Sequence, residues 1–431
     1  MRQEEEGWKS AGDKCACAKC FSEDAISNFI KANATENTCS YCGEESDEPI
    51  AAEMDEVLAF MAQGIWREYD MPENCLPYES AEGGWQLVEP TDSYDLVADS
   101  DWIADSDGYK ELFDDLVRAF SNNSYVPRDP LALSVSDGLK YSWGAFCNTV
   151  KHETRFVLFK IAPKRRKQVA YHPDDEWESA PVYAILQRIG SLVHEHSLIK
   201  GVPRLTTMIR ARQHADTDSP STASELGSPP PEFASQSRMS PAGISMFYGA
   251  ANEKTAFIET YDAHSLAKNS VTFGLFVTAR KLRFLDLTAI PDLPSIFDEH
   301  RFHQRHGLIF LRHLRSDMAK PINRDGREHY EYVPTQIVAE YFRRVFKTKG
   351  KGAIDGIMFP SSRNGAGVCY CIFSTPQNCA DDFRDKKAPV FSFDKKRRML
   401  VLKSARKMTV AACQATFLNP LNLDELFPGG A

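Results

Sequence analysis

The chain has 431 residues, which is too long for one ordinary hydrophobic core, and its 42% hydrophobic content is too high for a disordered protein. We therefore expect two or three domains. No apolar run approaches the roughly 18 residues of a membrane-spanning helix. The acidic start, MRQEEEGWKS, has no hydrophobic signal region. These features favour a cytoplasmic protein without a membrane partner.

Charge is distributed unevenly along the chain. Residues 1–200 contain 19 Lys and Arg against 37 Asp and Glu, a balance of −18. Residues 201–431 contain 32 against 23, a balance of +9. The front half therefore makes a poor surface for nucleic acid, whereas the back half favours a ligand that carries phosphate.

In chain order, the first predicted domain is a cysteine-rich segment over residues 1–45. It contains two C-x2-C pairs separated by eighteen residues. Two such pairs can close a tetrahedron of thiolates around zinc and leave no open coordination position, which indicates a structural site. The alternatives are four unrelated thiols, or Cys15 as a substitute ligand. The expected zinc ligands are Cys17, Cys20, Cys39 and Cys42. The cysteines expected in the core are Cys75, Cys147, Cys369, Cys371, Cys379 and Cys413.

Residues 46–200 have the apolar spacing of a small helical bundle. Between 50 and 69, apolar residues recur at three- and four-residue intervals and form one stripe, at Met54, Val57, Leu58, Met61 and Ile65. The same spacing of apolar residues recurs further along the chain. The predicted helices cover residues 50–69, 109–120, 142–160 and 180–199.

After Gly201 the pattern becomes that of a mixed α+β domain, predicted over residues 201–385. A polar loop at 217–232 precedes short runs rich in β-branched and aromatic residues. The predicted strands cover 244–248, 271–277, 282–285, 354–359 and 369–373, and the predicted helices cover 252–262, 299–317 and 334–346. A C-terminal extension, 386–431, adds the strand-like pieces VFSF, RMLVLK and MTVAACQATF and the ending NPLNLDELFPGG.

The stretch 208–262 holds the residues with the clearest chemistry. Arg210 and Arg212 alternate in an apolar-flanked run, and we expect them to point to opposite faces if the run is a strand. Arg238 precedes a tight loop, and Glu259 is the carboxylate of a mostly apolar helical segment. Arginine forks match pyrophosphate oxygens, and a carboxylate can bind a ribose hydroxyl. The pattern predicts a pocket for a phosphorylated sugar; the alternative is that the arginines are surface or ion-paired residues.

The order of these motifs resembles the RES domain. An early Arg is followed by an R-x-(N/S)-P-x-G loop at 238–243, a strand with Tyr248, a helix that ends in Glu259, a P-T-Q helix at 334–336 and a P-S loop at 360–361. The resemblance covers about residues 205–375. The loop at 238–243 lacks the usual aromatic residue and Asn. The resemblance implies a fold related to ADP-ribosyltransferases and NAD as the substrate.

The resemblance also implies roles for individual residues. The catalytic residues are Glu259, Arg210 and Ser361. Glu259 would stabilise charge on the ribose, and Ser361 would bind phosphate or the acceptor. Arg238 and Tyr248 match positions that line the pocket in the family, and we expect them to bind NAD together with Arg212 and Ser362.

Such a domain cleaves the bond between nicotinamide and ribose. It passes the ADP-ribosyl group to water, phosphate or a protein, as an NAD glycohydrolase, an NAD phosphorylase or an ADP-ribosyltransferase. The expected setting is a bacterial toxin–antitoxin or phage-defence system. The expected partners are NAD, an antitoxin or other regulatory protein, and a second copy of the chain. A protein that senses a nucleotide without turnover is an alternative.

The front half resembles the HEPN/RES N-terminal region found before RES domains. HEPN domains can be ribonucleases through an R-x4-6-H motif, and Arg188 and His194 have that spacing. A HEPN-type ribonuclease is therefore a second alternative. The acidic balance of residues 1–200 argues against RNA as a partner.

Overall fold

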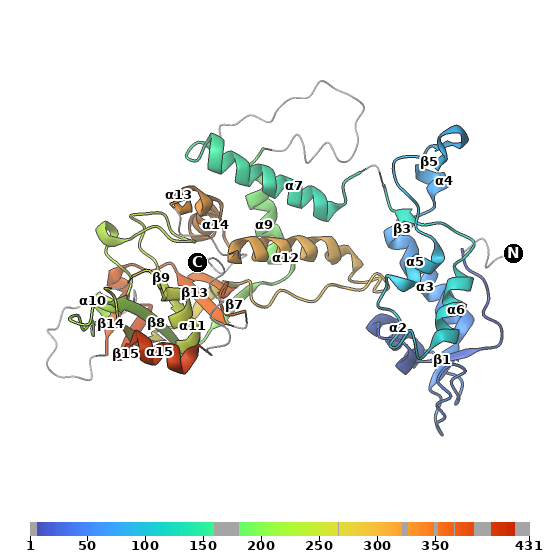
Figure 1. Cartoon of the computed structure of the whole chain (residues 1–431), viewed down its shortest axis with the longest axis horizontal. Coiled ribbons are helices and arrows are strands. Elements are labelled where there is room, and N and C mark those ends of the chain that lie inside the picture. Colours follow the sequence, from blue (N-terminus) through green and yellow to red (C-terminus); the bar gives the residue numbers. More distant parts are fainter. Residues whose placement is uncertain are drawn as a thin grey trace. The chain divides into compact units, whose positions relative to one another are not determined.

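In the computed structural model, the chain folds into two compact units (Figure 1). The first comprises Met1–Gly138 and Asp292–Ile309, and the second comprises Leu139–Pro291 and Phe310–Ala431. Thus residues 139–200, which the sequence groups with the helical domain, lie in the second unit. The residues that the structure describes are 7–130, 132–158, 181–265, 267–320, 326–348, 352–365, 367–382 and 398–418.

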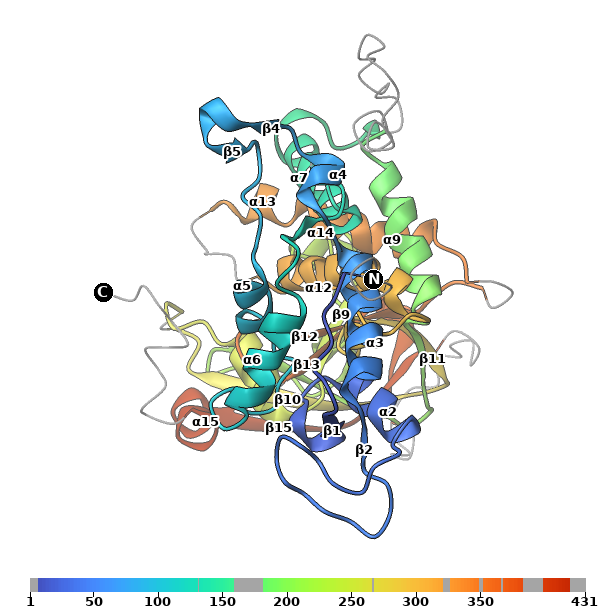
Figure 2. The ribbon, with the colours of Figure 1, turned by 90° about the vertical axis from the view of Figure 1, so that its right-hand side faces the viewer.

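The first unit combines short helices with small two-stranded sheets (blue to cyan in Figure 2). Three antiparallel strand pairs join β1 to β2, β3 to β6 and β4 to β5. The strands are β1 (Cys15–Cys17), β2 (Ala51–Glu53), β3 (Tyr69–Asp70), β4 (Tyr78–Glu79), β5 (Gly84–Trp85) and β6 (Val126–Pro127). The helices are α2 (Asp24–Ala32), α3 (Met54–Glu68), α4 (Pro72–Cys75), α5 (Ser93–Ala98) and α6 (Lys110–Ala119).

Helix α3 forms the centre of this unit's core. The five residues of its predicted apolar stripe are all buried. Phe297 packs against this helix although it lies more than 200 residues further along the chain, and 2% of it is exposed. A Cβ atom added to Gly64 would lie 2.1 Å from the Phe297 ring, so the close approach requires glycine there. The segment 292–309 therefore contributes to the core of the first unit.

The second unit is built on a mixed sheet of nine strands in the described part of the chain. Their order is β14-β15-β10-β8-β9-β13-β12-β11-β7. The pairs β11–β12 and β14–β15 are parallel, and the other neighbours are antiparallel. The strands are β7 (Ile199–Val202), β8 (Thr207–His214), β9 (Phe247–Ala250), β10 (Ser270–Thr278), β11 (Leu282–Asp286), β12 (Gly356–Pro360), β13 (Val368–Ile372), β14 (Cys379–Asp381) and β15 (Leu400–Thr409).

Apolar side chains are buried on both faces of this sheet. On β8, Met208 joins one apolar cluster with Phe247 and Phe276, and Ala211 joins another with Phe257. The second cluster lies under α11 and α15, which contact each other beside the sheet in Figure 1. The longer helices that lie in this unit or extend into it are α7 (Val135–Asn148), α9 (Ala184–Glu195), α11 (Glu253–Thr260), α12 (Arg305–Ala319), α14 (Val333–Arg344) and α15 (Val410–Phe417). The short helices are α10 (Ala223–Leu226) and α13 (Glu328–Glu331). The first residues of α7 and α12 fall within the bounds of the first unit.

The mixed α+β class is confirmed, but some local predictions were wrong, two of them in the segments MTVAACQATF and 217–232. The piece MTVAACQATF was expected to be a strand; its first two residues end β15 and the rest forms α15. The hydroxyl of Thr409 caps that helix by accepting from the Ala412 amide. The polar loop at 217–232 contains a helical turn, α10. VFSF and NPLNLDELFPGG lie outside the described residues.

Two cysteines expected in the core are only half-buried. Cys75 ends the short helix α4, where its sulfur donates to the Met71 carbonyl, and Cys147 lies near the end of α7. The other four, Cys369, Cys371, Cys379 and Cys413, are buried as expected. Among the described residues, we find no helix whose length and apolar content would let it cross a membrane.

Candidate active site

A cavity of about 690 Å³ opens in the sheet of the second unit, beside the place where β8 and β9 diverge. In the described residues these two strands share one register pair, Ile209 with Ala250, whereas β8 and β10 pair over eight positions. Residues of β8, β9 and β13 line the cavity together with α11 and the segment 224–235. Its volume is that of a typical small-molecule site.

Arg210 lines the cavity from β8, and its guanidinium lies over the ring of Phe247, 5.3 Å from the ring centre. Its Nη1 atom is buried and has no hydrogen-bond partner among the described residues. Burial lowers the pKa of Arg210 to about 10, and the charge of Arg212 adds to this shift. A buried donor without a partner is costly, so this atom is free to bind a ligand oxygen.

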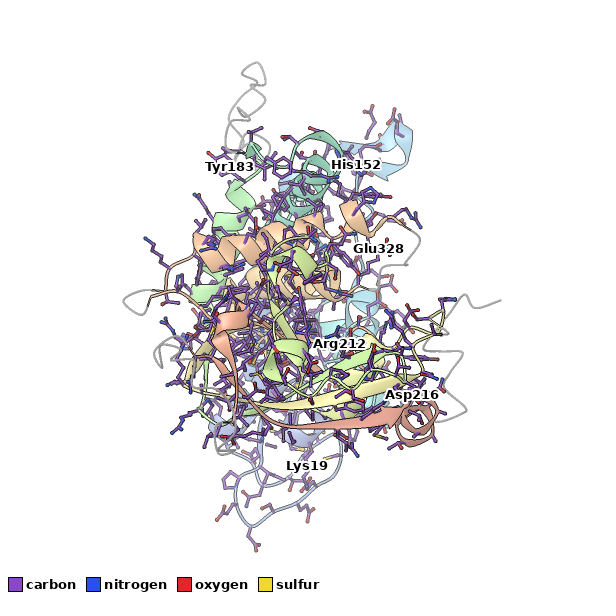
Figure 3. The ribbon with its side chains drawn as sticks, turned by 90° about the vertical axis from the view of Figure 1, so that its left-hand side faces the viewer. Lys19, His152, Tyr183, Arg212, Asp216 and Glu328 are labelled. Carbon is purple, nitrogen blue, oxygen red and sulfur yellow. The ribbon has the colours of Figure 1, made fainter. Side chains whose placement is uncertain are left out.

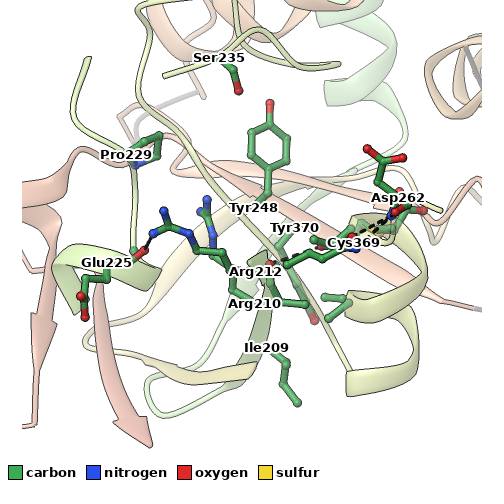
Figure 4. A pocket seen from close by; sticks show the side chains of 18 of the residues that line it. Ile209, Arg210, Arg212, Glu225, Pro229, Ser235, Tyr248, Asp262, Cys369 and Tyr370 are labelled. Atoms are coloured by element: carbon green, nitrogen blue, oxygen red, sulfur yellow. Dashed lines mark hydrogen bonds between the residues drawn. The ribbon is translucent and has the colours of Figure 1, made fainter. Parts of the chain in front are cut away.

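Arg212 lines the same cavity and lies two register positions from Arg210 in β8, so the expectation that the two arginines face opposite sides was wrong. Side chains two positions apart in a strand lie on the same face. Figure 4 shows the two guanidinium groups side by side, and Nη1 of Arg212 donates to the Glu225 carbonyl (2.6 Å). Figure 3 labels Arg212 together with Asp216, which follows β8 and accepts from the Ser270 hydroxyl (2.8 Å).

Tyr248 of β9 contributes its side chain to the cavity, and its hydroxyl is held in place. The hydroxyl accepts from the Ser237 hydroxyl (2.7 Å) and the Met239 amide (3.2 Å), and it shares a hydrogen bond with the Ser240 hydroxyl (3.0 Å). Burial raises the pKa of Tyr248 well above its ordinary value. Gln336 of α14 fixes this loop by donating to the carbonyls of Ser237 and Ser240.

Glu259 lies near the end of α11, and Ser361 holds its carboxylate. The Ser361 hydroxyl donates to Oε1 of Glu259 (2.5 Å) and accepts from the amides of Asn364 (2.9 Å) and Arg363 (3.3 Å). Ser361 is 4% exposed and, in the described structure, it does not line the cavity. Its side chain is therefore directed at Glu259 and at its own turn.

Arg238 and Ser362 also lie outside the cavity lining of the described chain. Nη1 of Arg238 donates to the Met318 carbonyl (2.7 Å), and Nη2 donates to the Ser362 hydroxyl (3.4 Å). The charge of Arg238 still acts on the site. The pKa of Cys369, which lines the cavity, is raised by burial and by the charge of Glu259, whereas the charge of Arg238 opposes this shift.

Several lining residues were missed by the sequence reasoning. Gln213 of β8 accepts from the Asp262 amide (2.9 Å) and donates to the Lys268 carbonyl (2.8 Å), so it fixes the chain that follows α11. Phe233, another lining residue, directly follows the polar loop at 217–232. The alternation in RARQH gives a weak signal for Gln213, whereas Phe233 left no motif.

The four predicted zinc ligands lie together in the first unit. The sulfur of Cys17 is 3.8 Å from that of Cys20 and 3.5 Å from that of Cys42, and the sulfurs of Cys20 and Cys39 are 3.7 Å apart. A tetrahedron with zinc–sulfur bonds of about 2.3 Å has edges of roughly 3.8 Å. The four residues thus fit a zinc ion, and Cys15 is not in this cluster.

The residues of the HEPN-type motif are engaged with their own surroundings. Arg188 of α9 forms an ion pair with Glu195 (2.9 Å). His194 stacks on Phe346, and its Nε2 lies 3.3 Å from the Lys347 carbonyl oxygen. These contacts account for both side chains without RNA chemistry.

Comparison with known families agrees with the composition of the cavity. Two arginines, a held carboxylate and a tyrosine in one cavity of a mixed α+β unit characterise a site for an anionic ligand. The RES domain family matches residues 207–394, and the family described as HEPN/RES N-terminal domain 1 matches residues 32–164. The chain therefore contains a RES domain preceded by a HEPN/RES N-terminal domain, as its motifs predicted.

RES domains are generally associated with NAD-consuming toxin systems. The Arg188–His194 pair falls outside both matched regions. No curated protein and no solved structure matches the chain.

Proposed function

We propose that the RES domain of this chain is an NAD-consuming enzyme that cleaves the bond between nicotinamide and ribose. The observation that carries this proposal is that Glu259, Arg210, Arg212 and Tyr248 line one cavity. These residues come from two strands and a helix that lie apart in the sequence. We further propose that the sheet belongs to the ADP-ribosyltransferase-like class that the resemblance implies.

The arginine pair supplies the binding site for the pyrophosphate. Nη1 of Arg210 has no partner among the described residues, and Arg212 keeps donors free beyond its bond to the Glu225 carbonyl. A guanidinium in a partly desolvated site forms strong hydrogen bonds with phosphate oxygens. The pyrophosphate would remove the cost of leaving Arg210 unpaired. Arg238 adds positive charge from outside the lining.

Glu259 supplies the stabilisation of the reacting ribose. As the bond from the anomeric carbon to the nicotinamide nitrogen breaks, its electron pair goes to nicotinamide, which leaves neutral, and the ribose gains positive charge. A carboxylate held at that position stabilises this charge. The acceptor then forms the new bond to the anomeric carbon. Water gives ADP-ribose and a proton, and phosphate or a protein side chain gives the corresponding adduct.

Incubation of the purified full chain with NAD, with and without phosphate, tests this proposal. We expect mass spectrometry to show nicotinamide together with one ADP-ribosyl product, whose identity reveals the acceptor. Glu259→Gln should lower kcat by roughly 100-fold or more, since it removes the charge that stabilises the transition state. Glu253→Gln, on the same helix but outside the lining of the described cavity, is the matched control. Absence of nicotinamide in both conditions would contradict the proposal.

We also propose that this activity acts in the cytoplasm as a toxin in a toxin–antitoxin or phage-defence setting. The family match supports this setting. An enzyme that depletes NAD requires restraint, and an antitoxin or other regulatory protein is the expected partner. Expression of the wild-type chain should arrest growth and lower cellular NAD, whereas Glu259→Gln should do neither.

For the first unit we propose a structural zinc ion held by Cys17, Cys20, Cys39 and Cys42. The spacing of the four sulfurs supports this proposal. With four thiolate ligands the ion has no open position for a substrate, so it would stabilise the fold and take no part in catalysis.

A further inference from the structure

Phe233 combines two features, exposure to solvent and a place in the lining of the cavity. Its side chain is 76% exposed, and it also lines the cavity of the second unit. Exposure alone does not single it out, since Phe156 is 89% exposed. Of the large hydrophobic side chains exposed in the described chain, however, Phe233 is the one that lines the cavity.

The backbone that carries Phe233 is fixed by hydrogen bonds. Phe233 ends a 3-10 turn (η5, Pro231–Phe233), and its amide donates to the Pro230 carbonyl (3.0 Å). The next residue, Ala234, is buried; its amide donates to the Pro231 carbonyl (3.1 Å), and its carbonyl accepts from the Gly243 amide (2.8 Å). The aromatic ring is thus presented to solvent from an anchored turn.

The segment before the turn is anchored as well. The buried hydroxyls of Ser228 and Ser374 lie 2.6 Å apart and share a hydrogen bond. Three consecutive prolines follow at 229–231, and each has its φ angle restricted by its ring. Pro229 and Pro230 line the cavity together with Phe233. The segment 229–233 therefore presents a rigid apolar wall with one free aromatic face.

The position of this wall indicates which part of a dinucleotide it meets. In Figure 4, Arg210 and Arg212 lie between Pro229 of this wall and Asp262, which follows α11. A ligand whose pyrophosphate binds the arginines, and whose nicotinamide ribose meets Glu259 of α11, directs its adenosine toward the opposite wall. Tyr248 has its hydroxyl held by the loop 237–240, whereas Phe233 keeps its ring exposed.

We propose that Phe233 is the stacking platform for the adenine base, and that it sets the affinity for adenine dinucleotides. This proposal rests on the proposed NAD-consuming function. A flat apolar ring at the mouth of a cavity suits a purine, because stacking buries both surfaces and needs no hydrogen bonds. The contact is made equally in the ground state and in the transition state, so it affects KM and not kcat.

The test compares Phe233→Ala with the wild-type chain in steady-state kinetics. We expect the KM for NAD and the inhibition constant of ADP-ribose to rise about 5- to 100-fold, the range measured for base stacking on aromatic residues. The inhibition constant of nicotinamide and kcat should change less than about twofold. Phe233→Trp should restore the wild-type KM, since it restores an aromatic face.

Phe156→Ala is the matched control, because it removes an exposed phenylalanine outside the lining of the described cavity. An unchanged KM in Phe233→Ala would overturn the proposal. A rise in the inhibition constant of nicotinamide without a rise for ADP-ribose would also overturn it, because the ring would then meet the other end of NAD.

Failure of the proposed function can be distinguished from failure of the adenine site. If the wild-type chain releases no nicotinamide, the NAD-consuming function fails, and calorimetric titration with ADP-ribose then decides the adenine site. Binding that is lost in Phe233→Ala and kept in Phe233→Trp would support that site. Absence of ADP-ribose binding to the wild type, or equal binding to Phe233→Ala, would overturn it.

Discussion

Ser361 differs most from the role that its family resemblance implies. The resemblance assigns it to phosphate or to the acceptor, but its hydroxyl donates to Glu259 and accepts two backbone amides of its own turn. These three bonds use its hydrogen-bonding capacity. We therefore infer that Ser361 is a positioning residue that acts through Glu259.

Removal of this hydroxyl should lower kcat and leave KM nearly unchanged. In Ser361→Ala the carboxylate of Glu259 loses its donor, and we expect kcat to fall about 10- to 100-fold. Ser361→Thr keeps the hydroxyl and should recover part of the loss. Ser404→Ala, on an exposed part of β15, serves as the control. A rise in KM with an unchanged kcat would instead place Ser361 in contact with NAD.

The residues of the site differ in how far the sequence reveals them. Arg210 and Glu259 stand in recognisable motifs, and the structure places both in the cavity. Gln213 has only the weak signal of the alternating RARQH run and Phe233 has no motif, because their roles come from contacts made after folding. The error about the two arginines came from the geometry of a strand, in which alternate side chains share a face.

Among the elements, α10 shows how local capping shapes the cavity. Its capping box joins Thr222 and Glu225: the Glu225 carboxylate accepts from the amides of Ser221 (2.9 Å) and Thr222 (3.0 Å). The same residue offers its carbonyl oxygen to Arg212. A single-turn helix thereby holds one wall of the site, so its stability bears on ligand binding.

Replacement of Glu225 should destabilise this unit in a pH-dependent way. We expect Glu225→Ala to lower the free energy of unfolding by about 1 kcal/mol at pH 7, the usual effect of a lost cap. Hydrogen bonds from the Ser221 amide and then from Thr222 lower the pKa of Glu225 below its ordinary 4.5. The stabilisation is therefore complete above pH 4.5 and is lost as the pH falls through the lower folded value.

Urea denaturation of the mutant and the wild type at pH 7 and at about pH 3 would check this expectation. The difference between the two proteins should shrink at the lower pH. Glu232→Ala, an exposed residue of the same loop, is the control. A difference that is equal at both pH values would show that the carboxylate does not carry the effect.

Regular apolar patterns predicted the longest helices and several strands of the large sheet, but they missed short elements such as α5, β7 and β14. They also missed α15 and the divergence of β8 from β9. The helix α15 begins with Val410 and contains no charged residue, so it resembles a strand in sequence. The Thr409 cap and the apolar cluster under the helix decide its conformation. The divergence of β8 from β9 left no sign in the sequence, because register depends on contacts between distant segments. That divergence is what places the cavity.

For the whole molecule, sequence order is a poor guide to which residues share a core. The boundary expected at residue 200 falls inside the second unit, because α9 and the residues from 139 onward belong there. The segment 292–309 lies within the RES match yet belongs to the first unit. Composition and periodicity assign residues to types of element, but they do not say where a chain leaves one core and returns.

Removal of zinc should loosen the first unit selectively. The cysteine cluster lies next to β1 and β2 in a small core, and a closed site of this kind contributes directly to folding. We expect elemental analysis to find one zinc ion per chain. Chelation or Cys39→Ser should increase hydrogen exchange in residues 14–54 and leave β8 and β10 protected. A chain purified without zinc, whose exchange is unaffected by chelation, would contradict the site.

The burial of Phe297 in the first unit has a consequence for gene rearrangement. A gene rearrangement that copied residues 201–431 as an uninterrupted block would carry this phenylalanine away from α3, the helix that buries it. The separated block would then expose an apolar side chain to solvent, and the remaining part would keep a cavity beside Gly64. We therefore expect neither part to be stable alone, and we expect evolution to keep the two parts together in one gene.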